Sequence, residues 1–546
     1  MDPFLVIWGV TALVLAAVLM PKWLRVAQRE HYIPGWTARI ARGWYRTKPL
    51  SWWPIAAAIL VVLPVSFVIS AVFEWVAVVY IAPVVAALVA TVSPWGLRIR
   101  GTSSKFAWTD RVKRLAVIWF VLWLGVVAVL IVVLQMLSAA LIVALGPLAM
   151  SSEAAFVALM LCAAIVNNAA LVVAVILAPT LTDLALVIAK PLESLLSHKW
   201  LVAAQKKIKQ VRPTVVAITG SYGKTSTKGY VTHLLQAQYS VVPSPASFNN
   251  LLGLSRAVND KLTPGTEVFV AEMGVYQPGE IRELAKSFPP DIAAITVIGE
   301  AHLERMRNRE TIFQAKAEIT EKARIVVLPI DDPMLADLAA LCAKLGKEVV
   351  TVSAQGAPAD VSIDPVAGTL TSKGETVPVV IPGVGHAVNI AVAAGIAFAL
   401  NVPVASYAPR LSNLPGASHR AEIAQAPSGA AIVDDTYNSN PVGAHRALEG
   451  AAALAAERGG PLVVVTPGMI ELGSVQAERN RAFAEAIAQA GGTLCAVGYT
   501  NRAALRQGNP EALWFRHRTE AMTEALKRAG ATGVILVEND LPDHYA

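Results

Sequence analysis

A glycine-rich turn directly after an apolar segment is the feature of this sequence with the clearest chemistry. Residues 214–226 have the sequence Thr-Val-Val-Ala-Ile-Thr-Gly-Ser-Tyr-Gly-Lys-Thr-Ser. Gly220 and Gly223 let the backbone approach an anion, and the N–H groups of the turn and of a helix starting near Lys224 can bind phosphate. Lys224 would neutralise phosphate oxygens, and the Thr225 hydroxyl would ligate Mg²⁺. A chance glycine-rich turn is the alternative, but Gly-Lys-Thr directly after an apolar strand argues against it.

Further segments follow the turn in a fixed order. They are Ser247-Phe-Asn-Asn-Leu-Leu-Gly, Val270-Ala-Glu-Met-Gly-Val-Tyr-Gln-Pro-Gly-Glu-Ile, Ile298-Gly-Glu-Ala-His-Leu-Glu, Ala315-Lys-Ala-Glu-Ile, Asp434-Asp-Thr-Tyr-Asn-Ser-Asn-Pro and Gly468-Met-Ile-Glu-Leu-Gly. Together they resemble the Mur ligase family, most closely the branch that adds D-alanyl-D-alanine to a UDP-N-acetylmuramoyl tripeptide. The resemblance covers residue 213 to the C-terminus. It implies an ATP-dependent amide ligase, in which ATP activates a carboxylate as an acyl phosphate, an amine attacks it and ADP is released.

The resemblance also implies catalytic and metal-binding residues. Thr225 and Glu272 match Mg²⁺ ligands, and His302 matches the ligand of a second metal ion. Lys316 matches a lysine that many family members carry as a carbamate, an anionic metal ligand, so Lys224, His302 and Lys316 are the expected catalytic residues. Metal ions and cations are needed because the reaction concentrates negative charge. Taken alone, Glu272 could be a solvated strand end, His302 a helix cap and Lys316 a surface lysine.

The same resemblance distributes the nucleotide contacts over several parts of the chain. Asn389 would contact adenine, Arg420 the ATP phosphates and Asp435 the ribose, with Asn438 beside the nucleotide. His419 precedes Arg420 where the family usually has Gly. The C-terminal groups would reach the phosphates only when the domains close, which excludes water from an acyl phosphate. The phosphate loop itself would contribute Gly220, Ser221, Gly223, Lys224, Thr225 and Ser226.

The N-terminal third of the chain has a different composition from the rest. Over 546 residues, 55% are hydrophobic, only 16% are charged and the mean hydropathy is +0.52. A soluble protein of this size carries more charge. The excess lies before about residue 190, in runs that approach the roughly 20 residues needed to cross a bilayer. The expected spans are Phe4–Met20, Pro54–Phe73, Trp75–Val92, Leu115–Leu141 and Ala154–Ala178. The whole run Leu115–Met150 is too long for one simple span and is either a span with a re-entrant piece or one long tilted helix.

Lys and Arg determine the expected orientation in the membrane. They concentrate in Pro21–Trp53 and Pro94–Arg114, which places both loops in the cytoplasm. The sequence therefore predicts a multi-pass protein of a bacterial-type inner membrane, with its N-terminus outside and everything after Pro179 in the cytoplasm. Residues 191–212 are either an amphipathic helix on anionic lipid or a plain tether. The expected interface anchors, or alternatively a docking surface for a lipid-linked substrate, are Trp36, Trp44, Trp52 and Trp53.

Charge and cysteine content argue against other classes of protein. The net charge is +7, but no aromatic-and-basic pattern of an RNA-binding module accompanies it, so nucleic acid is not an expected partner. The three cysteines, Cys162, Cys342 and Cys495, are far apart and form no C-x-x-C. A zinc ribbon, a redox motif and a disulfide framework are therefore not expected.

The chain is expected to contain a membrane domain and two soluble domains. A polytopic α-helical membrane domain occupies 1–190 and a juxtamembrane linker 191–212. An α/β Mur ligase central ATP-binding domain follows at 213–403, and a Rossmann-like α/β C-terminal domain at 404–546. Apolar strands alternate with helical stretches, which predicts mainly parallel sheets with ligands at the carboxyl ends of the strands. The expected strands include 215–219, 268–271, 293–297, 431–434, 462–466, 494–497 and 534–537, with a β-rich region at 349–381.

The expected function is a membrane-bound, ADP-forming ligase that adds an amino acid or dipeptide to a cell-wall precursor. Its cofactors would be ATP and Mg²⁺. Because membrane spans stand where the family has a UDP-substrate domain, a polyprenyl-linked acceptor is the hypothesis. The alternatives are a poly-γ-glutamate-type synthase, a transporter with an ATP motor and a non-catalytic membrane scaffold. The specific motifs argue against the first, the absence of a full Walker A and of L-S-G-G-Q against the second, and the retained catalytic residues against the third.

Overall fold

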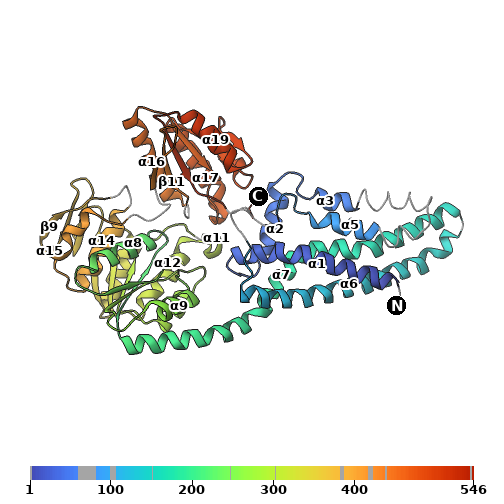
Figure 1. Cartoon of the computed structure of the whole chain (residues 1–546), viewed down its shortest axis with the longest axis horizontal. Helices are drawn as coiled ribbons and strands as arrows, with labels where there is room; N and C mark the ends of the chain where they lie inside the picture. Colours follow the sequence, from blue (N-terminus) through green and yellow to red (C-terminus); the bar gives the residue numbers. More distant parts are fainter. Residues whose placement is uncertain are drawn as a thin grey trace. The chain divides into compact units, whose positions relative to one another are not determined.

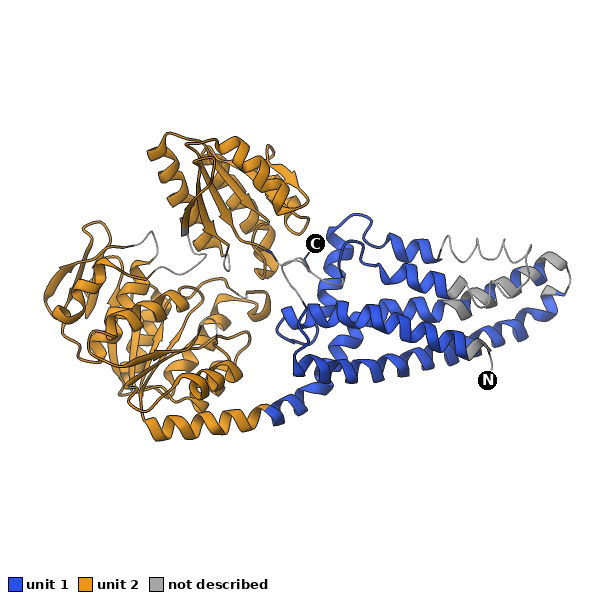
Figure 2. Cartoon of the chain, viewed as in Figure 1, with its two compact units in different colours: residues 1–196, 541–546 blue, residues 197–540 orange. Residues whose placement is uncertain are grey.

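The chain forms two compact units, which Figure 1 shows by sequence and Figure 2 by unit. In the computed structural model, unit 1 comprises Met1–Leu196 together with Leu541–Ala546, and unit 2 comprises Ser197–Asp540. Each unit has hydrophobic clusters of its own. The structure describes residues 3–59, 82–98, 106–150, 152–245, 248–301, 303–381, 386–415, 422–436, 440–541 and 544–545.

Unit 1 is built from helices. Their bounds are α1 (Pro3–Arg29), α2 (Trp36–Thr47), α3 (Trp53–Ala57), α5 (Ala82–Thr91), α6 (Asp110–Ala149) and α7 (Glu153–Val211), whose last residues from Ser197 belong to unit 2. Within the described residues, three helical stretches are long and apolar enough to cross a membrane: Val6–Arg29, Asp110–Leu148 and Ala169–Val211.

The observed helices differ in length from the expected spans. α6 is one helix from Asp110 to Ala149, as the alternative of a single long helix over Leu115–Met150 predicts, and α7 runs from 153 to 211 without a break. The stretch 191–211 is therefore helical, and whether it lies on lipid or serves as a plain tether stays a prediction. Most of the expected span Pro54–Phe73 and the first residues of Trp75–Val92 lie at residues 60–81, outside the described residues. The described remainder of Trp75–Val92 contains α5.

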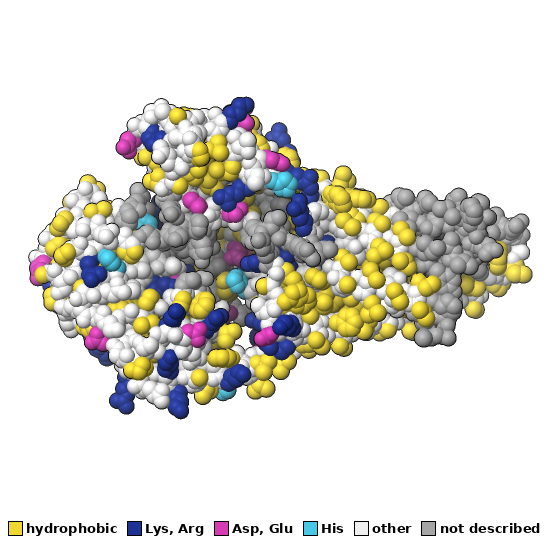
Figure 3. Space-filling model, in the orientation of Figure 1, with side chains coloured by type: hydrophobic (Ala, Val, Ile, Leu, Met, Phe, Trp, Pro, Cys, Tyr) yellow, Lys and Arg dark blue, Asp and Glu magenta, His cyan; other side chains and the backbone are white. Residues whose placement is uncertain are grey.

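Apolar side chains are exposed along the surface of unit 1. Figure 3 shows hydrophobic side chains gathered over this unit, whereas charged side chains are frequent over unit 2. On α6, Val117, Val121 and Val143 are 65%, 63% and 77% exposed. Contiguous apolar surface of this kind marks a site of contact with lipid or protein.

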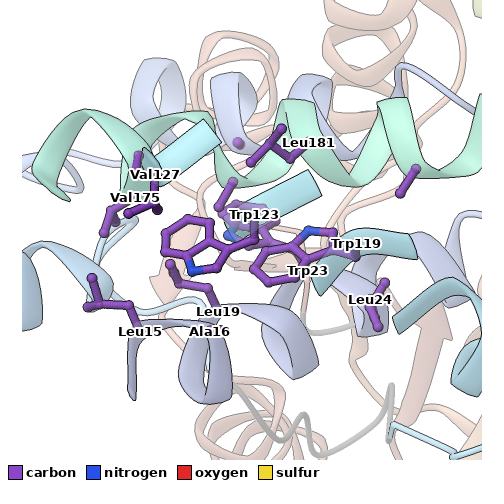
Figure 4. Packing of buried hydrophobic residues seen from close by; sticks show 14 of the residues in the cluster. Leu15, Ala16, Leu19, Trp23, Leu24, Trp119, Trp123, Val127, Val175 and Leu181 are labelled. Atoms are coloured by element: carbon purple, nitrogen blue, oxygen red, sulfur yellow. The ribbon is translucent and has the colours of Figure 1, made fainter. Parts of the chain in front are cut away.

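Tryptophan side chains form the centre of the unit 1 core, as Figure 4 shows. Trp119 and Trp123 lie one turn apart on α6, and their rings stack with centroids 5.4 Å apart. Trp119 Nε1 donates to Thr182 Oγ1 and Trp123 Nε1 to the carbonyl of Ala12, both at 2.9 Å. These acceptors matter because a buried N–H left unpaired costs about 1–3 kcal/mol. They tie α6 to α7 and to α1.

The expected first cytoplasmic loop begins inside α1, and two of its basic residues are buried. Lys22 and Arg25 are 1% and 0% exposed. Lys22 Nζ donates to the carbonyl of Ser93 and Arg25 Nη2 to the carbonyl of Arg98, both at 2.7 Å. Both cations thus hold the segment after α5 against α1. The charge pattern of the sequence could not distinguish these buried cations from solvated ones.

α2 is capped by a residue of another helix. Asp183 of α7 accepts the backbone N–H groups of Thr37 at 3.1 Å and Ala38 at 2.9 Å. The first N–H groups of a helix have no partner within the helix, and a carboxylate there is favourable. Because Trp44 lies further along α2, this cap also positions Trp44.

His544 and Tyr545, near the C-terminus, bond Glu30, directly after α1, and Trp44 of α2 in unit 1. His544 is 1% exposed and its Nε2 lies 2.9 Å from Glu30 Oε1. The Tyr545 hydroxyl donates to the same oxygen at 3.1 Å, and Trp44 Nε1 donates to the carbonyl of His544 at 2.8 Å. The interpretation of Trp44 as an interface anchor is therefore wrong, because this indole is 4% exposed and bonds the tail.

Unit 2 contains a nine-stranded sheet with strand order β2-β3-β1-β4-β5-β6-β7-β8-β9. The bounds are β1 (Thr214–Thr219), β2 (Val241–Pro243), β3 (Val268–Glu272), β4 (Ile292–Ile295), β5 (Ile325–Pro329), β6 (Glu348–Ser353), β7 (Val361–Asp364), β8 (Thr369–Ser372) and β9 (Glu375–Pro378). Strands β1 to β7 pair in parallel, and β8 and β9 are antiparallel. The expected parallel sheet and the β-rich region at 349–381 are confirmed.

Helices cover both faces of this sheet. Their bounds are α8 (Lys224–Leu235), α9 (Leu251–Lys261), α10 (Glu280–Ser287), α11 (Leu303–Met306), α12 (Arg309–Ala317), η3 (Glu318–Thr320), α13 (Pro333–Lys344), α14 (Ala387–Ala399), α15 (Val404–Tyr407) and η4 (Ala408–Ser412). α8 and α14 pack on one face, and α9, α10, α12 and α13 on the other. Although α15 follows the expected boundary at residue 403, Val404, Tyr407 and Leu411 pack in the same cluster as α14.

A second, six-stranded sheet has strand order β10-β11-β15-β12-β13-β14. Its strands are β10 (Glu422–Gln425), β11 (Ala431–Asp435), β12 (Leu462–Thr466), β13 (Thr493–Val497), β14 (Leu513–Phe515) and β15 (Val534–Glu538). α16 (Pro441–Arg458), η5 (Gly473–Val475), α17 (Gln476–Gln489) and α18 (Arg502–Gly508) lie on one face, and α19 (Arg518–Ala529) on the other. The C-terminal α/β domain and its expected strands are confirmed.

The contact of the tail with Glu30 predicts that Glu30→Ala releases the end of the chain. The substitution removes the acceptor shared by His544 and Tyr545, and each buried donor loses about 1–3 kcal/mol. Amide hydrogen exchange at Tyr545 should accelerate by at least about tenfold. The matched control is Glu511→Ala, which removes an exposed carboxylate. Equal exchange in the two variants would show that Glu30 does not hold the tail.

Candidate active site

Three parallel strands of the first sheet end side by side at one edge. Ile218 of β1 pairs with Glu272 of β3, and Thr219 pairs with Ile295 of β4. The glycine-rich turn, Glu272 and the segment that begins at Thr296 therefore meet at one place. In open α/β sheets ligands bind at this carboxyl edge.

The glycines of the turn are required by packing. A Cβ on Gly220 would overlap the hydroxyl of Thr296, and a Cβ on Gly223 would overlap the Asn389 side chain. Gly223 also has a φ of 76°, which lies in the left-handed region that favours glycine. The backbone of the turn therefore passes between side chains of two other elements.

The first turn of α8 presents groups suited to an anion. The N-cap residue, Gly223, has no side chain that could accept hydrogen bonds from the first N–H groups of α8, so these groups can donate to an anion. Lys224 Nζ donates to the carbonyl of Gly220 at 2.6 Å, which holds the ammonium over the turn. Ser221 and Ser226 are 1% and 4% exposed. The residues expected to hold phosphate thus lie within one turn and the start of α8.

Glu272 receives hydrogen bonds from three side chains. Thr225 Oγ1 and Lys228 Nζ donate to Oε2 at 3.0 and 2.9 Å, and Asn249 Nδ2 donates to Oε1 at 3.3 Å. Glu272 is 2% exposed, so its interpretation as a solvated strand end is wrong. Burial raises the pKa of Glu272, but Lys228 and Lys224 outweigh burial and the pKa lies below its ordinary value. The carboxylate is therefore charged at neutral pH.

Lys228 and Asn249 were not among the expected site residues. Lys228 lies four residues after Lys224 on α8, and this spacing places both on one helix face. That spacing was a usable signal. Asn249 lies in the segment Ser247–Gly253, but only the folded chain shows that it reaches Glu272.

Lys316 is buried on α12. It is 2% exposed, so its interpretation as a surface lysine is wrong. Burial lowers the pKa of Lys316 well below its ordinary value, and the charge of Lys224 lowers it further. Glu318 accepts the backbone N–H groups of Gly279 at 2.8 Å and Arg282 at 3.0 Å, so it caps α10.

The oxygen donors at the strand ends fit Mg²⁺. Thr225 Oγ1 and Glu272 Oε2 are hard ligands 3.0 Å apart, and Mg²⁺ is usually held by one or two carboxylates together with substrate phosphates. The described part of the chain contains no group of three or more His, Cys, Asp or Glu side chains that could hold a metal ion. His302, Arg420 and Asn438 lie outside the described residues.

A cavity of about 650 Å³ lies beside the phosphate loop, at the ends of β4, β5 and β6. Small-molecule sites are commonly concave pockets of this size at the carboxyl edge of a sheet. One side is formed by the start of α14 and another by Arg446 of α16, so both domains of unit 2 contribute. The lining includes Thr296, Pro329, Ala354, Ala387, Val388 and Arg446.

Asn389 of α14 lies at the phosphate-loop side of this region. It is 6% exposed, and within the described structure its Oδ1 has no hydrogen-bond partner. A buried amide oxygen of this kind fits an N–H donor of a ligand, as a contact with adenine requires. The sequence identified the residue, and the fold brings it next to Gly223.

The C-terminal domain contributes two acidic residues at adjacent strand ends. Asp435 of β11 pairs in register with Glu538 of β15. Burial raises the pKa of Glu538 to about 8; a hydrogen bond of 2.7 Å from Thr466 opposes this shift and the charge of Asp435 adds to it. Glu538 is therefore mostly protonated at neutral pH. Sequence reasoning missed Glu538, because a Glu after an apolar strand is more often solvated than buried.

Two family matches cover most of unit 2. Residues 218–405 match the Mur ligase middle domain, and residues 419–538 match the Mur ligase glutamate ligase domain.

Two curated relatives and a crystal structure are similar to this chain. The UDP-N-acetylmuramoyl-tripeptide–D-alanyl-D-alanine ligase of Bacillus subtilis is 32% identical over 283 residues, which are 50% of this chain and 60% of the relative. The ligase of the same name from Mycobacterium leprae is 40% identical over 129 residues, 23% of this chain and 25% of the relative. The chain thus matches less than two thirds of the length of either. The MurF ligase of Thermotoga maritima in complex with ADP has a TM-score of 0.55 at 24% identity, over 63% of this chain and 80% of that one, and shows a shared fold.

Because Asn389 Oδ1 has no hydrogen-bond partner within the described structure, we expect Asn389→Leu to weaken nucleotide binding without a comparable loss of stability. The affinity for Mg-ADP, measured by titration calorimetry, should fall by at least about tenfold if one good hydrogen bond is lost. The free energy of unfolding should change by less than about 1 kcal/mol, because Oδ1 has no partner to lose among the described residues. Asn413→Leu, at an exposed asparagine, is the control. Unchanged affinity in Asn389→Leu would exclude this residue from the nucleotide site.

Proposed function

The chain belongs to the Mur ligase family through residues 218–405 and 419–538, and from this premise we propose that it is an ATP-dependent, ADP-forming amide ligase. The observation that carries the proposal is the buried Glu272 carboxylate, bonded to Thr225 and Lys228 directly below the phosphate loop. A non-catalytic scaffold has no need of a charged, buried carboxylate at a phosphate-binding edge, because burying a charge is costly.

The residues of the site have different roles in such a reaction. ATP supplies the phosphoryl group that activates a substrate carboxylate as an acyl phosphate, which an amine converts to an amide. Lys224 offsets phosphate charge, and Thr225 and Glu272 hold Mg²⁺. Lys228 keeps Glu272 charged and oriented. Asn389 binds adenine and Asp435 the ribose, while the assignments of His302, Arg420 and Asn438 rest on the family resemblance.

We propose D-alanyl-D-alanine and a peptidoglycan precursor as substrates. Two supporting observations are the names of the curated relatives, UDP-N-acetylmuramoyl-tripeptide–D-alanyl-D-alanine ligase, and the motifs shared with that branch. The precursor carries the carboxylate and the dipeptide the amine.

We also propose that unit 1 is a membrane domain and that the acceptor is linked to a polyprenyl carrier. Apolar side chains exposed on α6 support a lipid environment. The positive-inside rule favours an outside N-terminus and cytoplasmic catalytic domains. A precursor already attached to lipid would be present at the same membrane face as those domains.

ADP release by the detergent-purified full chain tests the function. With Mg-ATP and D-alanyl-D-alanine, we expect release that requires a polyprenyl-linked muramyl peptide. Lys224→Ala should reduce this release by at least about 100-fold, because it removes a charge that offsets the transferred phosphate.

Each other outcome has a defined meaning. Release with a UDP-linked acceptor alone would exclude the lipid-linked acceptor and leave unit 1 as an anchor. No release with either acceptor, in protein that binds Mg-ADP, would exclude the proposed substrates. Equal release by wild type and Lys224→Ala would contradict the assignment of the phosphate loop.

We propose that Lys316 carries a carbamate, formed when its neutral amine adds CO₂ and releases a proton. The burial of Lys316 and its lowered pKa favour the neutral amine that this addition needs. Lys316→Ala should reduce ADP release by about 100-fold, and acetate should restore part of it by replacing the anionic ligand. The exposed Lys322→Ala is the control. Loss of activity without recovery in acetate or formate would argue against the carbamate.

A further inference from the structure

The segment Ile298–Met306 contacts two separate parts of unit 2. It follows β4, leads to α12 and includes the short helix α11; of its residues, His302 lies outside the described part. Its first residues touch the phosphate loop. Glu300 and the residues of α11 touch the C-terminal domain, at the loop before η5 and at α17.

The phosphate loop depends on the position of Gly299. Ser221 Oγ accepts the N–H of Gly299 at 2.9 Å and donates to the Gly299 carbonyl at 3.2 Å. The ring of Tyr222 lies so close to Gly299 that a Cβ at this position would overlap it. Thr296 Oγ1 donates to the carbonyl of Tyr222. A shift of Gly299 would therefore move both loop residues that precede Gly223.

Two ion pairs join the same segment to the C-terminal domain. Arg479 of α17 donates to Glu300 through Nε at 2.9 Å and through Nη2 at 2.7 Å. Arg305 Nη2 donates to Glu471 Oε1 at 2.8 Å. The first pair is bidentate, so it fixes orientation as well as distance. Glu300 is the direct neighbour of Gly299, and its pair with Arg479 therefore acts one residue from the phosphate-loop contact.

The second ion pair is more than a surface contact. The Arg305 side chain is 6% exposed, and its guanidinium lies over the Tyr276 ring, 4.7 Å from the centroid. The carbonyl of Glu471 accepts the N–H of Glu304 at 3.0 Å. Glu471 has a φ of 63°, a left-handed conformation that is costly for a residue with a Cβ. Packing and hydrogen bonding around this pair maintain that conformation.

We propose that Glu300 and Arg305 are positioning residues that link the phosphate loop to the C-terminal domain. Through them, the position of the C-terminal domain sets the conformation of Ser221 and Tyr222, and nucleotide at the loop favours the joined domains. Such linkage is reciprocal, so weakening the ion pairs must weaken nucleotide binding. The inference rests on the proposed nucleotide site but not on the identity of the acceptor.

A charge reversal at the domain contact tests the proposal in the full-length protein. Arg479→Glu should weaken Mg-ADP binding by at least about tenfold, within the usual range of coupling between sites. It should also accelerate amide exchange of residues 219–226. The double variant Glu300→Arg/Arg479→Glu should restore both to within about threefold of wild type, because the reversed pair can form again. The control is Arg481→Glu, on the same helix, where the arginine pairs only with Glu485 among the ion pairs of the described residues.

The outcomes separate this inference from the proposed function. If Arg479→Glu matches Arg481→Glu in both readouts, or if the double variant restores neither, the proposal is overturned. If wild type binds Mg-ADP but no acceptor supports ADP release, the proposed substrates are wrong. The linkage is then still decided by the measurements of Mg-ADP affinity and amide exchange. If wild type does not bind Mg-ADP, the proposed nucleotide site fails, and the linkage to a nucleotide fails with it.

Discussion

The candidate site depends on the charge balance around the buried Glu272 carboxylate. At 2% exposure a carboxylate is stable only with partners, and Lys228, Thr225 and Asn249 supply them from two other elements. β3 pairs with β1, and this pairing places Glu272 at the end of β3 beside the end of β1, where the phosphate loop begins. The sheet register, the glycines of the loop and the lysines of α8 therefore depend on one another, because all of them are needed to place Glu272 beside the phosphate loop.

The second domain of unit 2 takes part in this arrangement at two places. Arg446 lines the cavity beside α14, and Arg479 and Glu471 bond the segment that touches Ser221. A reactive acyl phosphate must be shielded from water, and a site shared by two domains can be open for substrates and closed for chemistry. Glu538 is also buried at a strand end of this domain, and burial raises its pKa to about 8.

Unit 1 differs from unit 2 in where its apolar and polar side chains lie. Its helices expose apolar side chains outward and bury tryptophans and cations inward. The buried Lys22 and Arg25 bond backbone carbonyls, the Trp119 indole bonds a hydroxyl and the Trp123 indole bonds a carbonyl. Polar groups that are buried away from water are stabilised by partners inside the protein. His544 is buried in this unit and Tyr545 packs against its core, so the segment Leu541–Ala546 belongs to unit 1 although unit 2 precedes it in the sequence.

The sequence by itself determined the fold class, the main strands of both sheets and the phosphate loop. These depend on local patterns: apolar strands that alternate with helices, and a glycine turn whose function is contained in consecutive residues. By resemblance it also predicted that Glu272, Lys316 and Asn389 belong to one site. Only the tertiary structure decided that Glu272 bonds Lys228 and Asn249, that Trp44 and Lys22 are buried, and that Glu300 and Arg305 reach the C-terminal domain. Burial and pairing are set by side chains distant in sequence, and a periodic or charge pattern carries no information about which distant partner will be there.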